Sequence, residues 1–293
     1  MAVSKTISKT KRAKNEPERG DTEPVVEVTA REIEDIEERS SPRPPVIYEI
    51  VRRQGEEEMV RSAFSLWWSG LAAGISISAS FLAEAVLQTH LADTSWRPLV
   101  TSFGYCFGFL LVVLSRQQLF TENTITAVLP LFATFTAENM RKLARLWSIV
   151  LIANFCGAMI AAAVFTYTPM ISPELHAGML ELSRGLLGHS FGAMLVKAIP
   201  AGFIIAAMVW LIPSADTAQF HVVTFTTYLI AAGGFMHIVA GSVEAFFLAL
   251  NGGAGWGFVV GGFLLPVAIG NILGGTVLFS LISYGQVAHQ MKA

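Results

Sequence analysis

A single histidine lies deep inside an apolar stretch of this chain, and polar residues break a second apolar stretch. His237 stands in AAGGFMHIVAGS (residues 231–242), and the other interruption is RQQLFTENT (residues 116–124). An ionisable side chain in a hydrophobic segment is a functional hypothesis by default; a core histidine bonded only to backbone is the alternative. An imidazole N–H beside a hydroxyl such as that of Thr121 can hold a small anion or donate a proton to it.

The two interruptions recur at a fixed spacing. Phe120 and His237, near their centres, are 117 residues apart. Asn154 and Asn271 are also 117 residues apart, and each has a glycine three positions later. These matches predict an internal repeat of three membrane spans in each half, with chance as the alternative. An odd number of spans per copy inverts the second copy relative to the first.

Membrane-spanning helices must position these residues. Of the 293 residues, 53% are hydrophobic and 14% are charged, and 26 of the 42 charged residues lie within residues 1–61. A soluble domain carries about 25% charged residues, and a helix crosses a bilayer with about 20 apolar residues. The sequence therefore predicts an all-α membrane protein with six spans, the second and fifth interrupted: 62–87, 97–133, 143–168, 191–212, 221–250 and 257–284.

Interrupted helices at matched positions predict a transport site. Irregular backbone at membrane depth is tolerated only where protein buries it or where it lines a cavity. Paired interruptions in two inverted halves mark the binding sites of transporters, and the N-termini of half-helices favour anions. Apolar side chains near the first break predict narrow constrictions, with ordinary helix packing as the alternative for each: Tyr105, Phe109, Leu119 and Phe120.

The segments around this body have their own predicted roles. Residues 1–45 are rich in Glu, Lys and Pro, which predicts a disordered, charged cytoplasmic tail. Residues 46–61 predict an amphipathic interfacial helix, with a solvated charged face as the alternative. Residues 62–285 form the predicted six-span transporter domain, and residues 286–293 a cytoplasmic C-terminus. Lys and Arg before the first span and after the second place both termini in the cytoplasm of a bacterial inner (plasma) membrane.

The sequence resembles the formate/nitrite transporter family from about residue 46 to residue 285. The motifs that carry the resemblance are LFT at 119–121, MVW at 208–210, GFMH at 234–237 and PVAIGNILGG at 266–275. The extended motif LFTENT and the long acidic tail are similar to a poorly characterised branch of that family. The resemblance implies a homopentamer in membrane lipid, with one aquaporin-like pore in each subunit.

Carried onto matching positions, the resemblance implies a substrate pathway. Its residues are Leu119, Phe120 and Thr121 as the mobile re-entrant loop and gate, His237 as the central histidine, Asn271 as the pore-side asparagine, and Tyr105, Phe109 and Ile230 at the constrictions. The chain departs from the family pattern at Met236, Gly202 and Gly241. Arg116 adds a positive charge near the gate that can attract an anion.

These features predict a channel or proton-coupled transporter for a small monovalent anion or its conjugate weak acid, of the formate, nitrite or hydrosulfide type. A pore for water or a small neutral solute is the main alternative, although two Asn-Pro-Ala repeats are missing. An intramembrane enzyme and a scaffold that recruits a cytosolic partner through the tail are weaker alternatives. We expect no enzymatic activity, no cofactor and no bound metal. The net charge of −2 gives no reason to expect a nucleic-acid partner.

Overall fold

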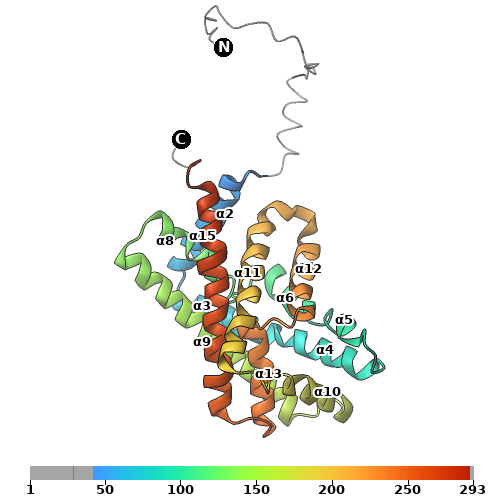
Figure 1. Cartoon of the computed structure of the whole chain (residues 1–293). Helices are drawn as coiled ribbons and strands as arrows, with labels where there is room; N and C mark the ends of the chain where they lie inside the picture. The colour runs from blue at the N-terminus through green and yellow to red at the C-terminus, as the bar shows by residue number, and fades with distance from the viewer. Residues whose placement is uncertain (1–28, 30–41, 291–293) are drawn as a thin grey trace, which may run out of the picture. The chain divides into compact units, whose positions relative to one another are not determined.

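The computed structural model describes Thr29 and residues 42–290, and all regular elements within these residues are helices (Figure 1). The expectation of a disordered tail falls mainly on residues outside this described part. In chain order the helices are α2 (Pro44–Val60), α3 (Ala63–Ser76), α4 (Ser78–His90), α5 (Arg97–Thr101), α6 (Cys106–Leu114), α7 (Asn123–Thr126), α8 (Leu129–Ala133), α9 (Ala137–Tyr167), α10 (Pro173–Arg184), α11 (Phe191–Ala215), η1 (Asp216–Ala218), α12 (Gln219–Ala232), α13 (Ile238–Leu250), η2 (Phe258–Leu264), α14 (Leu265–Ile272), η3 (Leu273–Ser280) and α15 (Leu281–Val287).

Serine and threonine side chains start four of these helices. Each accepts a hydrogen bond from the backbone N–H three residues later, at 3.1–3.2 Å. Such N-caps satisfy a donor that has no partner within the helix. The capping residues are Ser62 for α3, Thr136 for α9, Ser172 for α10 and Ser190 for α11.

Five helical segments of the described residues are long and apolar enough to cross a membrane. They are Ala63–His90, Arg97–Leu114, Ala137–Tyr167, Phe191–Ala232 and Phe258–Val287, and the shorter apolar segments are Asn123–Ala133 and Ile238–Leu250. The segment Phe191–Ala232 contains both α11 and α12, which lie side by side as a hairpin in Figure 1. The chain turns at Asp216, where φ is +39°. The prediction of an all-α protein with several membrane-length helices is therefore confirmed.

Both predicted helix interruptions are present. The first runs from the end of α6 at Leu114 to the start of α7 at Asn123, and the second from the end of α12 at Ala232 to the start of α13 at Ile238. The second is shorter than the sequence pattern indicated, because residues 238–242 already belong to α13. We refer to residues 115–122 and 233–237 as the first and second breaks.

Glycines let two pairs of helices approach closely. A Cβ atom on Gly74 of α3 would overlap the backbone of Asn154 in α9, and one on Gly202 of α11 would overlap the backbone of Asn271 in α14. Small residues at such positions allow close packing where no water drives helices together. The α3–α9 pair and the α11–α14 pair therefore hold the two asparagines in comparable settings.

The last membrane-length segment contains wide turns. The stretches η2 and η3 are π-helical and flank α14, and such turns often occur at functional sites. The hydroxyl of Thr276 in η3 donates a hydrogen bond to the carbonyl oxygen of Thr124 in α7 at 2.7 Å. The final segment thus contacts the helix that follows the first break.

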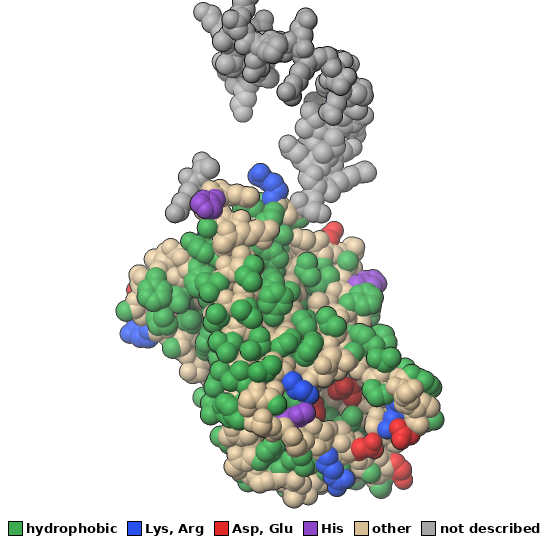
Figure 2. All heavy atoms as spheres, in the orientation of Figure 1, with side chains coloured by type: hydrophobic (Ala, Val, Ile, Leu, Met, Phe, Trp, Pro, Cys, Tyr) green, Lys and Arg blue, Asp and Glu red, His purple; other side chains and the backbone are tan. Residues whose placement is uncertain are grey.

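The face shown in Figure 2 is apolar over the middle of the molecule. Charged side chains gather near its two ends and around a hollow in its lower part. Large apolar side chains are exposed on membrane-length helices, including Phe64, Phe225 and Ile282 at 75%, 65% and 65%. Exposed apolar patches of this extent mark contact with lipid or with another protein.

Candidate functional site

The first break is held by Asn154 of α9. Its Oδ1 accepts a hydrogen bond from the N–H of Phe120 at 2.9 Å. Its Nδ2 donates to the carbonyl oxygens of Gln118 at 2.9 Å and of Gly70 at 2.8 Å. Backbone groups freed by a break at membrane depth must find partners within the protein. The buried amide of Asn154 therefore provides hydrogen-bond partners for two backbone groups of the first break and joins the break to α3.

Asn271 of α14 holds the second break with the same set of bonds. Its Oδ1 accepts from the N–H of Ile238 at 2.8 Å, and its Nδ2 donates to Met236 at 2.9 Å and to Ala198 of α11 at 2.8 Å. The amide is fully buried and its N–H groups are used by backbone carbonyls. At the position where the resemblance implies a pore-side asparagine, the structure has a side chain that fixes the backbone.

A hydrogen bond joins the two breaks. The Oγ1 atom of Thr121 and the Nε2 atom of His237 lie 2.7 Å apart, and both residues are buried. His237 caps α13, and its Nδ1 accepts a hydrogen bond from the N–H of Ala240 at 3.2 Å. A nitrogen that accepts carries no proton, so the neutral ring donates from Nε2 to Thr121. A doubly protonated ring would direct an N–H at the N–H of Ala240, so this geometry fits the neutral ring.

The residues just before Thr121 form an apolar barrier. Leu119 and Phe120 are 0% and 1% exposed. The ring of Phe120 packs edge-on against Trp147 of α9, with centroids 5.7 Å apart. The same backbone that bonds to Asn154 therefore carries two bulky side chains into the protein interior.

Two of the predicted constriction residues pack in the aromatic group around His237, and the third is buried just before the second break. Phe109 packs edge-on against the ring of His237 at 5.0 Å, and Tyr105 lies 5.1 Å from Phe109, one turn earlier in the chain. Ile230 of α12 is fully buried, three residues before the second break. The structure thus brings Phe109, Tyr105 and His237 into one aromatic group.

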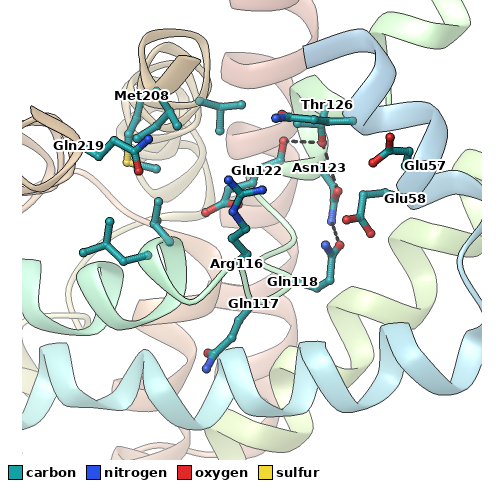
Figure 3. A pocket seen from close by; sticks show the side chains of 15 residues that line it. Glu57, Glu58, Arg116, Gln117, Gln118, Glu122, Asn123, Thr126, Met208 and Gln219 are labelled. Carbon is teal, nitrogen blue, oxygen red and sulfur yellow. Dashed lines mark hydrogen bonds between the residues drawn. The ribbon is translucent and has the colours of Figure 1, made fainter. Parts of the chain in front are cut away.

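A polar cavity of about 210 Å³, here termed cavity 1, adjoins the first break (Figure 3). Figure 3 shows Arg116 and Glu122 pointing into it from the first break, and Glu57 and Glu58 reaching it from α2. Apolar residues of α6 and α11 complete its wall. The lining residues are Gln54, Glu57, Glu58, Val113, Leu114, Arg116, Gln117, Gln118, Glu122, Asn123, Thr126, Met208, Val209, Ile212 and Gln219.

A second cavity of about 170 Å³, termed cavity 2, lies against His237. Its polar lining consists of Glu84, Tyr105, His237 and Glu244. The two cavities share no lining residue, and Leu119, Phe120 and Thr121 line neither. Among the described residues, no group of three or more His, Cys, Asp or Glu side chains could hold a metal ion. The two cavities are therefore distinct, and each adjoins one of the two breaks.

Arg116 stands where the sequence placed a cation near the gate. Its φ is +53°, a left-handed conformation that costs a non-glycine residue about 1–2 kcal/mol. Strained backbone of this kind persists where the surrounding structure enforces it, and it clusters at functional sites. The turn directs the side chain of Arg116 into cavity 1 (Figure 3).

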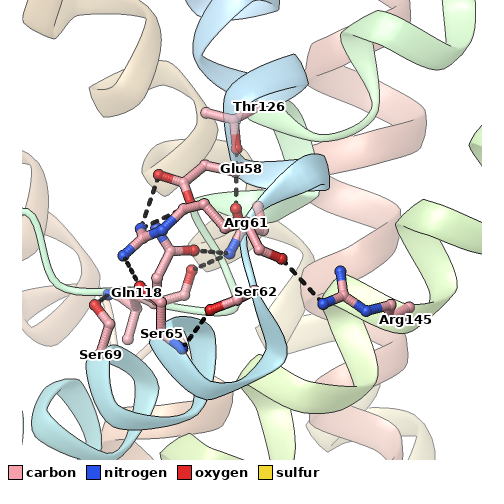
Figure 4. A network of polar contacts seen from close by, with 10 residues as sticks. Glu58, Arg61, Ser62, Ser65, Ser69, Gln118, Thr126 and Arg145 are labelled. Carbon is pink, nitrogen blue, oxygen red and sulfur yellow. Dashed lines mark hydrogen bonds and ion pairs between the residues drawn. The ribbon is translucent and has the colours of Figure 1, made fainter.

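A polar network fixes α2 beside cavity 1 (Figure 4). The Nη1 atom of Arg61 pairs with Glu58 Oε2 at 2.8 Å, and its Nη2 donates to Ser65 Oγ at 2.9 Å. Arg145 of α9 donates to the backbone carbonyl of Arg61 at 3.0 Å. At the other end of α2, the hydroxyl of Tyr48 donates to the carbonyl oxygen of Leu129 at 3.4 Å.

Sequence reasoning missed the contribution of α2 to the site. Gln54, Glu57 and Glu58 line cavity 1, and Arg61 holds Glu58. Their spacing of three, four and seven residues puts them on one helical face, which was the available signal. The same face is partly open to solvent, since Gln54 and Glu57 are exposed, and it also lies beside the first break. Gln219 carried no comparable signal, because its position depends on the turn at Asp216.

Comparison with known proteins identifies the family of this chain. The family model for the formate/nitrite transporter matches residues 45–285. The chain belongs to the formate/nitrite transporter family. This transporter is 41% identical over 262 residues to the inner membrane protein YfdC of Escherichia coli (strain K12), across 89% of this chain and 84% of YfdC. It is 26% identical over 241 residues to the formate channel FocA of Haemophilus influenzae, across 73% of this chain and 84% of FocA.

Solved structures of the same fold include two channels. A pentameric formate channel with formate bound superposes on the transporter with a TM-score of 0.66 at 22% identity, covering 78% of this chain and 98% of that one. An FNT family ion channel gives a TM-score of 0.72 at 17% identity, covering 82% and 98%. At these identities the likeness concerns the fold alone. The family predicted from the sequence motifs is confirmed.

Proposed function

We propose that this protein is a channel or proton-coupled transporter for a small monovalent anion or its conjugate weak acid, of the formate, nitrite or hydrosulfide type. The observation that carries the proposal is the buried hydrogen bond of 2.7 Å between Thr121 and His237. It joins the two breaks, and a cavity adjoins each of them. Membership of the formate/nitrite transporter family supports the same class of activity.

The chemistry of the barrier follows from the cost of moving a charge through apolar surroundings. An isolated anion without compensating partners is strongly disfavoured there, whereas a neutral weak acid crosses at lower cost. Leu119 and Phe120 have to move aside for a solute to pass. A solute that then replaces Thr121 at His237 Nε2 gains a donor from the imidazole and a hydroxyl partner from the threonine. The transported species is therefore hydrogen-bonded as it crosses the narrowest point.

The proposed architecture has six spans in a 3+3 inverted repeat. Its support is the equivalent bonding of Asn154 and Asn271, which hold their breaks at an offset of 117 residues. The turn at Asp216 divides the segment Phe191–Ala232 into a fourth span and the start of a fifth. The breaks then lie near the membrane midplane, and residues 62–285 form the transporter domain.

We further propose a homopentamer in a bacterial inner membrane with cytoplasmic N- and C-termini. The solved relative described as a pentameric formate channel and the relative described as an inner membrane protein support these assignments. The exposed apolar side chains of the spans provide surfaces for lipid and for neighbouring subunits. Residues 46–61 then lie at the inner membrane surface, and residues 286–293 end in the cytoplasm.

A substrate panel in proteoliposomes tests the proposal. Purified full-length protein is reconstituted, and uptake of formate, nitrite and hydrosulfide is measured between pH 5 and pH 8 against empty liposomes. We expect saturable uptake of at least one of these solutes that rises as the external pH falls. Absence of uptake of any small weak acid by correctly assembled protein would overturn the proposal. Osmotic swelling in water and glycerol gradients, without weak-acid uptake, would instead favour a neutral-solute pore.

A further inference from the structure

Cavity 1 contains buried hydrogen-bond acceptors that the protein itself does not satisfy. Neither Oε1 of Gln117 nor Oε1 of Glu122 has a hydrogen-bond partner among the described residues, and both atoms are buried. A buried polar atom without a partner costs free energy. Figure 3 shows Glu122 beside Arg116, whereas the amide of Gln117 points away from them, so a solute in the cavity that brings a hydrogen-bond donor to Oε1 of Glu122 is stabilised there.

Of the other acidic groups around Glu122, one is already in an ion pair and one is exposed to solvent. From α2, Glu58 is paired with Arg61 at 2.8 Å, and Glu57 is exposed. From the first break itself, Arg116 enters the cavity and makes no ion pair with any described residue. The walls from α6, α11 and α12 contribute only uncharged residues. Glu122 and Arg116 are therefore the buried acceptor and the available donor of this cavity.

The acceptor of Glu122 and the donors of Arg116 together complement one class of solute. A protonated oxyacid presents an O–H donor on one oxygen and an acceptor on the other, whereas its anion presents acceptors only. We propose that cavity 1 binds a small carboxylic acid, or an acid of the same two-oxygen form, with one oxygen facing Arg116 and its proton shared with Glu122. The inference rests on the proposed function and narrows its substrate class, because hydrosulfide has no oxygen atoms.

The proposal gives Glu122 a role in transport. The incoming anion is drawn to Arg116 and takes the proton of the Glu122 carboxyl group. The O–H bond of Glu122 breaks, an O–H bond forms on the substrate, and Glu122 becomes a carboxylate beside Arg116. The net charge of the three groups does not change, and no electrons are transferred to or from the protein. A hydronium ion from the solution at the mouth of the cavity returns a proton to Glu122 and is left as water, after the neutral acid has moved to the barrier.

The position of Glu122 suits this order of events. It follows directly after Leu119, Phe120 and Thr121, so protonation occurs on the cavity 1 side of the apolar barrier. The imidazole of His237 has its Nδ1 occupied by Ala240 and its Nε2 by Thr121 in the closed arrangement. Glu122 thus supplies the proton before the histidine is reached, and the histidine then acts as a hydrogen-bonding partner to the neutral acid.

Formate uptake by proteoliposomes at pH 5, 6, 7 and 8 tests this inference. The variants are Glu122→Gln, which keeps the size but loses the proton, Glu122→Asp, which keeps a carboxyl group, and Arg116→Gln. Glu174→Gln is the matched control, at an exposed glutamate of α10 that lines neither cavity. We expect Glu122→Gln to reduce uptake at least tenfold at pH 7 and less than twofold at pH 5. Glu122→Asp should keep the parental pH profile, and Glu174→Gln should stay within twofold at every pH.

Arg116→Gln should raise the formate concentration for half-maximal uptake at least fivefold without changing the shape of the pH profile. A parental pH profile in Glu122→Gln would overturn the inference while leaving the proposed function in place, since the parent would still transport formate. A parent that transports no weak acid would overturn the proposed function itself.

A second measurement decides the same point if Glu122→Gln does not assemble. Infrared difference spectra of the parent protein are recorded on addition of ¹³C-formate, whose own bands are shifted by the isotope. Loss of a protein carboxylic-acid C=O band is expected as Glu122 gives up its proton, and this loss should be retained in Glu174→Gln. An unchanged carboxylic-acid band on binding would overturn the inference.

Discussion

Thr121 and His237 are separated by 116 residues in the chain, yet their side chains lie 2.7 Å apart. Each belongs to a break in a helix, and each break is fixed by its own asparagine. The hydrogen bond therefore joins two segments that are each held independently. In the proposed function, a solute passes when this bond and the side chains of Leu119 and Phe120 yield while the asparagine bonds stay in place.

Two substitutions separate the role of His237 as the N-cap of α13 from its proposed role as a hydrogen-bonding partner of the substrate. His237→Asn keeps an acceptor for the N–H of Ala240, because asparagine is a good N-cap, whereas His237→Ala removes it at a cost of about 1 kcal/mol. We expect both variants to lower formate uptake across pH 5–8, because neither keeps the imidazole Nε2–H for the passing acid, and only His237→Ala to lower the melting temperature measurably. Uptake across pH 5–8 and thermal unfolding in detergent are the measurements. Parental uptake in both variants would contradict the assigned role.

The two asparagines should be essential for the folded breaks. Asn154→Ala and Asn271→Ala each leave several buried backbone groups without partners, at about 1–3 kcal/mol for each group. We expect each variant to be destabilised by at least about 3 kcal/mol, measured by denaturant unfolding in micelles. Asn139→Ala, at an exposed asparagine, is the control and should change stability by about 0.5 kcal/mol or less. An equal loss of stability in all three variants would argue against the hydrogen bonds that Asn154 and Asn271 make to the two breaks.

Two glycines of the same helix should respond in opposite ways to alanine. A methyl group on Gly202 overlaps the backbone of Asn271, whereas one on Gly192 meets open space. Gly202→Ala should therefore cost about 1–3 kcal/mol through overpacking, and Gly192→Ala should be neutral or stabilising by up to about 1 kcal/mol. Melting temperatures and the assembled fraction on size exclusion compare them. A Gly202→Ala variant as stable as the parent would show that α11 and α14 are not in such close contact.

The ion pair within α2 should make its docking sensitive to acid. The guanidinium of Arg52 donates to both carboxylate oxygens of Glu49, at 2.8 and 2.9 Å, and lowers the pKa of Glu49 from 4.5 to about 2. Because the folded pKa is the lower one, the stabilisation is full above about pH 4.5 and disappears as the pH falls towards 2. The carboxylate side chain is 38% exposed, so the pair contributes only roughly 0.3–0.5 kcal/mol.

Hydrogen exchange of α2 in the parent and in Glu49→Gln checks this expectation. At pH 7 the variant should exchange faster in α2, and the difference should shrink steadily between pH 4.5 and pH 2. Glu57→Gln serves as the control, since Glu57 makes no ion pair among the described residues. A difference that persists unchanged at pH 2 would assign the effect to something other than the charge of Glu49.

The sequence predicted those features that depend on spacing and hydrophobicity. The family, the helical membrane body and both breaks followed from apolar runs and from motifs such as LFT and GFMH. The matched asparagines followed from the offset of 117 residues, but their bonding did not, because sequence does not show whether an amide faces a cavity or a backbone. The role of α2 was missed for a similar reason: a polar helical face looks the same in sequence whether it meets bulk water alone or also lines a cavity.

The close backbone contacts at Gly74 and Gly202 leave no compressible layer between the paired helices. We expect a scaffold packed this closely to leave the working motions of the protein to the short non-helical segments at residues 115–122 and 233–237. A change of substrate specificity therefore needs new side chains at a few positions in these segments, whereas the helical scaffold can stay as it is. Directed evolution restricted to these two segments is the most direct route to variants that carry other solutes.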